Sequence, residues 1–169
     1  AVNRANGVIR QYASAKLEKA GDAGTTIAMA VVQGPIAVIA NVGDSRVYRL
    51  RNGEMRQITK DHSVIQRMVD AGMAQPEQVY THPSRNLIYR SLGADDSVKV
   101  DIFAPTIAPG DYLLLCTDGL WEMVQSPVKI AEIVFHATSL DAACTSLVQA
   151  ANAAGGEDNI GVVLAQAYE

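Results

Sequence analysis

The chain has 169 residues, of which 49% are hydrophobic, 19% charged and 5% aromatic, with a formal net charge of −4. A chain of about this length buries roughly 68–70% of its unfolded surface, which suits a single domain with a sizeable core. The mildly acidic composition, without a basic cluster, argues against nucleic acid as a partner. There is no apolar run long enough to span a bilayer and no charged-then-apolar signal segment, which argues against membrane insertion and secretion.

The two cysteines give a further indication of the compartment. Cys116 and Cys144 share no CxxC spacing and have no neighbouring histidine or cysteine. We expect both to be small buried hydrophobic residues, neither disulfide-bonded nor bound to zinc, in a protein of the reducing cytoplasm.

The first part of the chain is predicted to be a helix followed by strands. Apolar residues at helical spacing predict a helix from Val2 to about Ala20 that stops at Gly21. In the pair Asn52-Gly53 both positions tolerate positive φ, which is typical of a two-residue hairpin turn. Four apolar stretches predict strands that together form one antiparallel meander: 25–33, 36–41, 47–50 and 54–59.

From residue 63 onward, the predicted helices, loops and strands follow one another in a less regular order. A short helix is predicted over 63–71, and the polar stretch 73–96 is long enough to favour a functional loop or flap. Ser126-Pro127 begins a helix that runs to about His136. A second helix covers 140–154, and strands are predicted at 98–103, 112–116 and 159–167. Strands followed by paired helices indicate an α+β fold.

Three aspartates stand apart from the surface charges. Asp44 lies between two apolar strands, Asp118 follows the most hydrophobic strand, and Asp158 precedes the final strand. A carboxylate at the end of a buried strand is costly unless something compensates its charge. Hard divalent cations such as Mg²⁺ and Mn²⁺ bind such oxygen ligands. Ordinary turn formation explains each aspartate equally well, because spacing does not show that the three strand ends meet.

The histidines do not form a metal site by spacing. His62 precedes the short helix, where we expect a role at the helix start and not in catalysis. His136 lies at a predicted helix C-terminus, where the helix dipole favours a cation. The sequence contains no glycine-rich phosphate loop, no GxSxG motif and no CxxxxxR nucleophile motif.

Six short segments follow one another in a fixed order: GTT (24–26), ANVGDSR (40–46), TKDHS (59–63), RSLG (90–93), TDGLW (117–121) and GEDN (156–159). With these segments the chain resembles the type 2C (PPM) family of metal-dependent protein serine/threonine phosphatases over almost its whole length. The short loops between the segments resemble the bacterial members.

The resemblance implies a four-layer α-β-β-α sandwich, in which two antiparallel sheets are flanked by helix pairs. It also implies two Mn²⁺ or Mg²⁺ core ions and a metal-bridging water that attacks phosphoserine or phosphothreonine directly. Asp118 and Asp158 match two core metal ligands, and Asp44 matches a ligand of a third, weaker site shared with Asp118. Residues 63–97 match the helix and flap region. No further catalytic residue is assigned.

One family segment has no counterpart in this sequence. No Asp-Gly-x-Gly motif occurs in the chain, although its aspartate bridges both metals in the family. We therefore expect residues 1–169 to be a single phosphatase domain that lacks its N-terminal third, inactive by itself and prone to self-association. The partners of the parent protein are expected to be phosphorylated substrates of a cytosolic serine/threonine kinase, and the kinase itself.

Two other interpretations remain open. The fold could serve as a catalytically dead pseudophosphatase that binds a partner. Alternatively, the chain could be an unrelated α+β domain whose aspartates only form turns.

Overall fold

The computed structural model describes residues 1–15 and 23–169. Its elements in chain order are α1 (Val2–Ala15), β1 (Ile27–Gln33), β2 (Ile36–Val42), β3 (Arg46–Arg51), β4 (Glu54–Gln57), α2 (Val64–Asp70), the 3₁₀ helix η1 (Pro76–Tyr80), β5 (Asp101–Phe103), β6 (Tyr112–Cys116), α3 (Asp118–Trp121), α4 (Pro127–His136), α5 (Leu140–Ala153) and β7 (Val162–Gln166). The predicted end of the first helix, with its stop at Gly21, lies outside the described residues.

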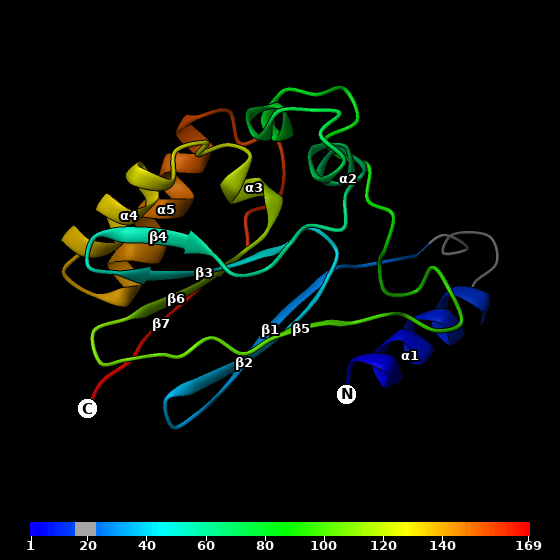
Figure 1. Ribbon diagram of the computed structural model, residues 1–169, viewed down its shortest axis with the longest axis horizontal. Coiled ribbons are helices and arrows are strands. Elements are labelled where there is room, and N and C mark those ends of the chain that lie inside the picture. Colours follow the sequence, from blue (N-terminus) through cyan, green and yellow to red (C-terminus); the bar gives the residue numbers. More distant parts are fainter. Residues whose placement is uncertain (16–22) are drawn as a thin grey trace.

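The strands form two antiparallel sheets, one ordered β1-β2-β5 and the other β4-β3-β6-β7 (Figure 1). The prediction of a single meander is therefore wrong, because β2 and β3 belong to different sheets. The reason is burial. Ile39 of β2 packs with Val47 of β3 and Leu113 of β6 between the sheets. Two stacked hairpins bury a common core that one flat meander would leave exposed.

Local signals in the sequence correctly predicted most turns and helix starts. Asn52 and Gly53 both have positive φ and join β3 to β4. The hydroxyl groups of Ser63, Ser126 and Ser139 each accept a backbone N–H three residues later and cap α2, α4 and α5. Two elements were missed, namely η1 within the stretch predicted to be irregular, and α3.

The layers follow the order predicted for the family fold (Figure 1). Helices α4 and α5 cover the four-stranded sheet with a core that contains Leu114, Trp121, Ile130, Leu147 and the buried Cys116. Cys144 is half-buried, and both cysteines are free. On the other side, α1 packs on one end of the three-stranded sheet. The α+β sandwich is thus confirmed.

Part of the outer face of the three-stranded sheet is solvent-exposed. Val31, Val38 and Ile102 share this face by their pairing register, and they are 55%, 42% and 60% exposed. In the part of the chain that the structure describes, α1 is the helix that lies on this side. No described helix combines the length and the apolar character that crossing a membrane requires.

Candidate metal centre

Asp44 lies in the turn between β2 and β3, where the chain passes from one sheet to the other. Gly43 has a φ of +105°, and a Cβ atom there would lie 2.3 Å from Cγ2 of Thr26. This position therefore requires glycine. Asp44 is buried, and burial together with the charge of Asp118 raises the pKa of its carboxyl group from 3.8 to about 6. A carboxylate in this position is stabilised by any cation that binds beside it.

Asp118 follows β6 directly and begins α3. A Cβ atom on Gly119 would lie 2.3 Å from the carbonyl oxygen of Asn159, so glycine lets α3 approach the loop that carries Asp158. Burial, and then the negative charge of Asp158, raise the pKa of Asp118. These two aspartates are therefore close enough to repel each other.

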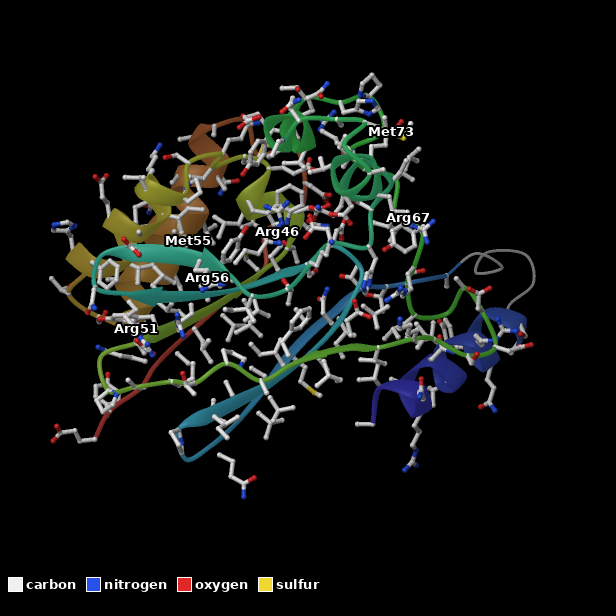
Figure 2. The ribbon with its side chains drawn as sticks, in the orientation of Figure 1. Arg46, Arg51, Met55, Arg56, Arg67 and Met73 are labelled. Atoms are coloured by element: carbon white, nitrogen blue, oxygen red, sulfur yellow. The ribbon has the colours of Figure 1, made fainter. Side chains whose placement is uncertain are left out.

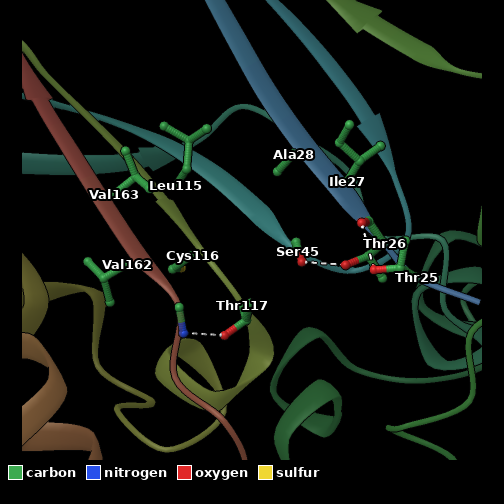
Figure 3. Close-up of a pocket in the computed structure, with 11 residues that line it drawn as sticks. Thr25, Thr26, Ile27, Ala28, Ser45, Leu115, Cys116, Thr117, Val162 and Val163 are labelled. Carbon is green, nitrogen blue, oxygen red and sulfur yellow. Dashed lines mark hydrogen bonds between the residues drawn. The ribbon is translucent and has the colours of Figure 1, made fainter. Parts of the chain in front are cut away.

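Asp158 lies in the exposed loop between α5 and β7, and its carboxylate accepts the N–H of Asn159 at 2.6 Å. The Thr117 hydroxyl donates to the carbonyl of Asn159 at 3.2 Å and accepts the N–H of Gly161 at 2.9 Å. Figure 3 shows the second of these bonds. They tie the segment that precedes Asp118 to the segment that follows Asp158.

Two pockets contain the three predicted residues. Asp44 and Asp118 line a pocket of about 400 Å³, and Asp118 and Asp158 line one of about 110 Å³. The two pockets share Asp118 and Asn86, so they adjoin each other. The structure thus brings the three aspartates into one region, although their role as metal ligands stays a prediction.

The chemical type of the donor atoms around these pockets suits a hard cation. They are carboxylate oxygens, which Mg²⁺ and Mn²⁺ prefer, and Glu122 at the end of α3 adds another. Within residues 1–15 and 23–169, however, no group of three or more His, Cys, Asp or Glu side chains could hold a metal ion. By themselves, the described residues therefore do not form a complete cation site.

Arg85, between η1 and β5, was not predicted as a site residue. Its Nε atom lies 3.4 Å from Oε2 of Glu122, and its Nη2 atom lies 3.8 Å from Oε2 of Glu157, beside the smaller pocket. It places a positive charge next to the candidate ligands. The only sequence signal for it was the prediction that 73–96 is a functional loop.

A buried ion pair between Arg46 and Asp61 lies next to the Asp44 turn. The Arg46 guanidinium donates to both carboxylate oxygens of Asp61, with 2.6 Å between Nη2 and Oδ2. It also stacks on the indole of Trp121, 3.4 Å from the ring centroid, and Trp121 Nε1 donates to the carbonyl of Asp44 at 3.1 Å. Figure 2 shows Arg46 in the interior. The pair connects the Asp44 turn to α3.

A third pocket, of about 360 Å³, lies between β1 and the β6–β7 pair (Figure 3). Apolar side chains and hydroxyl groups line it, and on one side Thr26 Oγ1 lies 2.8 Å from Ser45 Oγ. Among the described strands, β1 and β7 are edge strands of their sheets. This pocket therefore lies between two sheet edges and contains none of the candidate ligands.

Known proteins match this chain over nearly its whole length. The family model described as Protein phosphatase 2C matches residues 1–151. Serine/threonine phosphatase stp of Listeria innocua is 38% identical over 165 residues, which cover 98% of this chain and 65% of that protein. The crystal structure of serine/threonine phosphatase Stp1 from Staphylococcus aureus has a TM-score of 0.93 and 34% identity, and the match covers 99% of this chain and 65% of that one.

The catalytic domain of serine/threonine protein phosphatase PstP, solved in complex with two manganese ions, has a TM-score of 0.83 and 31% identity. That match covers 97% of this chain and 68% of the other. The chain belongs to the protein phosphatase 2C family. It spans 65% of the length of the Listeria relative.

Proposed function

We propose that the complete protein is a metal-dependent protein serine/threonine phosphatase that hydrolyses phosphoserine and phosphothreonine by direct attack of water on phosphorus. The observation that carries the proposal is the convergence of Asp44, Asp118 and Asp158 on two pockets that share Asp118. The phosphatase relatives support the same activity. The test is Mn²⁺-dependent hydrolysis of a phosphothreonine peptide by the complete protein, and no turnover at saturating Mn²⁺ would contradict the proposal.

In this proposal Asp118 and Asp158 hold two core Mn²⁺ or Mg²⁺ ions, and Asp44 with Asp118 holds a third ion more weakly. Such ions, when bound, acidify water and offset the charge of the phosphoryl group. Arg85 lies beside the same pocket, and its guanidinium suits a phosphoryl oxygen in geometry and charge.

We assign residues 63–97 as the helix and flap region that borders the site. Asn86 and Ile88 line the larger pocket together with Asp44. Met73 and Leu87 expose apolar side chains to solvent, and Figure 2 shows Met73 on the outside of this region. The region can therefore contact the peptide on either side of a phosphorylated residue. The expected partners are cytoplasmic proteins phosphorylated by a serine/threonine kinase, and that kinase.

For residues 1–169 alone we propose weak binding of at most one Mn²⁺ and no phosphatase activity. Three aspartates provide too little charge to hold two divalent ions close together. The edge strands β1 and β7 and the exposed apolar face of the three-stranded sheet favour self-association. Adding the segment that the longer relatives carry, fused or in trans, should restore two tight Mn²⁺ sites and turnover together. Robust hydrolysis by the 169-residue chain alone would refute this part of the proposal.

A pseudophosphatase that only binds a partner is the second candidate. The incomplete donor set among the described residues favours it for the isolated chain. The complete protein separates the two candidates, since a pseudophosphatase binds phosphopeptide without releasing phosphate.

A further inference from the structure

His62 is the histidine that the fold buries most completely. It is 1% exposed, whereas His136 is exposed and His82 is partly exposed. The sequence predicted a role at the start of α2, but the hydroxyl of Ser63 fills that role by accepting the N–H of Gln66. The imidazole of His62 makes different contacts, and they lead to the Asp44 turn.

Two hydrogen bonds join His62 to Gly43. The backbone N–H of His62 donates to the carbonyl of Gly43 at 2.9 Å, and the backbone N–H of Gly43 donates to Nδ1 of His62 at 2.9 Å. Gly43 directly precedes Asp44 in a turn that has no room for a Cβ atom, because Thr26 packs against it. A displacement of Gly43 therefore displaces Asp44.

These bonds define the tautomer of His62. Because Nδ1 accepts a backbone N–H, the ring proton is on Nε2, which lies 3.1 Å from Oδ2 of Asp101 and donates to it. Arg90 Nη1 also lies 2.8 Å from Nε2, but two donors cannot bond to each other. Arg90 instead donates to Oδ1 of Asp101 at 2.9 Å and to the carbonyl of Lys99 at 3.2 Å. Burial lowers the pKa of His62, which keeps this neutral form.

The same residue also contacts the flap region. The carbonyl of His62 accepts the N–H of Tyr89 at 2.9 Å, and the N–H of Val64 donates to the carbonyl of Leu87 at 2.8 Å. The flap segment 86–89 therefore runs beside His62. Two of its residues, Asn86 and Ile88, line the larger pocket together with Asp44. His62 thus contacts Gly43 and Tyr89, the chain neighbours of the lining residues Asp44 and Ile88, without lining the pocket itself.

We propose that His62 is a positioning residue that fixes the Asp44 turn, through Gly43, relative to the flap wall of the pocket. The proposal rests on the metal role proposed above for Asp44. The weaker metal site then depends on the Nδ1 contact, while the two core sites at Asp118 and Asp158 do not.

Two substitutions in the complete protein separate the two ring contacts. In His62→Asn, the amide oxygen takes the place of Nδ1 and can still accept the N–H of Gly43. In His62→Gln, the longer amide reaches toward Asp101 in the place of Nε2 and leaves the N–H of Gly43 without its acceptor. His136→Asn and His136→Gln make the same changes at an exposed histidine and serve as controls.

The measurements are Mn²⁺ affinity of each site by calorimetry, the melting temperature, and hydrogen exchange of the Gly43 amide. Residues that orient a metal ligand typically change metal affinity about 10–100-fold when replaced. We expect His62→Gln to lower the Mn²⁺ affinity of the weaker site by about 10-fold or more. The same variant should increase the rate of hydrogen exchange at the Gly43 amide. His62→Asn should change that affinity by less than about 3-fold, although both variants lose the native imidazole and melt at lower temperature.

Equal loss of weak-site affinity in the two variants, or no loss in His62→Gln, would overturn the positioning role. A wild-type protein that binds two core Mn²⁺ ions and lacks the weaker site would overturn it as well. A protein that shows the expected split in Mn²⁺ affinity but releases no phosphate from phosphopeptide would support the positioning role while refuting the proposed activity.

Discussion

Replacing Asp44 by asparagine is expected to stabilise the metal-free protein at neutral pH. Asp44 is buried beside Asp118, and the pKa of its carboxyl group is about 6 instead of 3.8. The folded state therefore holds this proton more tightly than the unfolded state does. The stability that this group contributes is complete below pH 3.8 and is lost as the pH rises through about 6.

The difference between the two pKa values corresponds to roughly 3 kcal/mol of destabilisation above pH 7. This value is an upper limit for Asp44→Asn, because the amide removes the charge and keeps the shape but is itself a buried polar group. In a protein of this size it corresponds to a rise in melting temperature of at most roughly 6–12 °C. A carboxylate that lowers stability in the absence of metal is typical of a residue retained for function.

The assay is calorimetric melting in a metal chelator between pH 4 and pH 8. Asp44→Asn should melt above the wild type at pH 8, and the gap should close toward pH 4. Asp95→Asn, at an exposed position, provides the control. Added Mn²⁺ should stabilise the wild type more than Asp44→Asn, because the ion binds only the folded protein. If Asp44→Asn melts below the wild type at pH 8 in chelator, then Asp44 is a structural turn residue and the argument from its buried charge is wrong.

Three further predictions concern the candidate site and the elements around it. Asp118→Asn or Asp158→Asn in the complete protein should remove nearly all Mn²⁺-dependent turnover without unfolding the protein, because an amide cannot replace the ligand charge. Near wild-type kcat in either variant would contradict the assignment of these residues as metal ligands. A short Gly/Ser linker in place of 73–84 should spare hydrolysis of a small aryl phosphate and impair that of phosphopeptides, and an equal loss for both substrates would refute the contact role. Asp61→Ala should lower the free energy of unfolding, measured with denaturant, by about 3–5 kcal/mol, because it leaves the Arg46 guanidinium buried and unpaired. A decrease below about 1 kcal/mol would argue against a stabilising role of the Arg46–Asp61 pair.

Short-range patterns predicted the elements whose ends are set by neighbouring residues. The hairpin at Asn52-Gly53 follows from backbone conformations that few other residues tolerate, and the start of α4 follows from the cap formed by Ser126. The aspartates at the strand ends also stood out, because a carboxylate next to a buried strand is costly wherever the strand packs.

Tertiary packing decided which of these elements meet. The separation of β2 from β3 into two sheets depends on side chains that bury against each other only when the hairpins stack. The contact between Trp121 and the Asp44 carbonyl joins residues 77 positions apart. For His62, the local sequence showed a helix start, and only the folded chain brings its ring to Gly43 and Asp101. Local propensity acts over a few residues, whereas the burial of a shared core selects partners at any separation, and so the arrangement of the site follows from the packing.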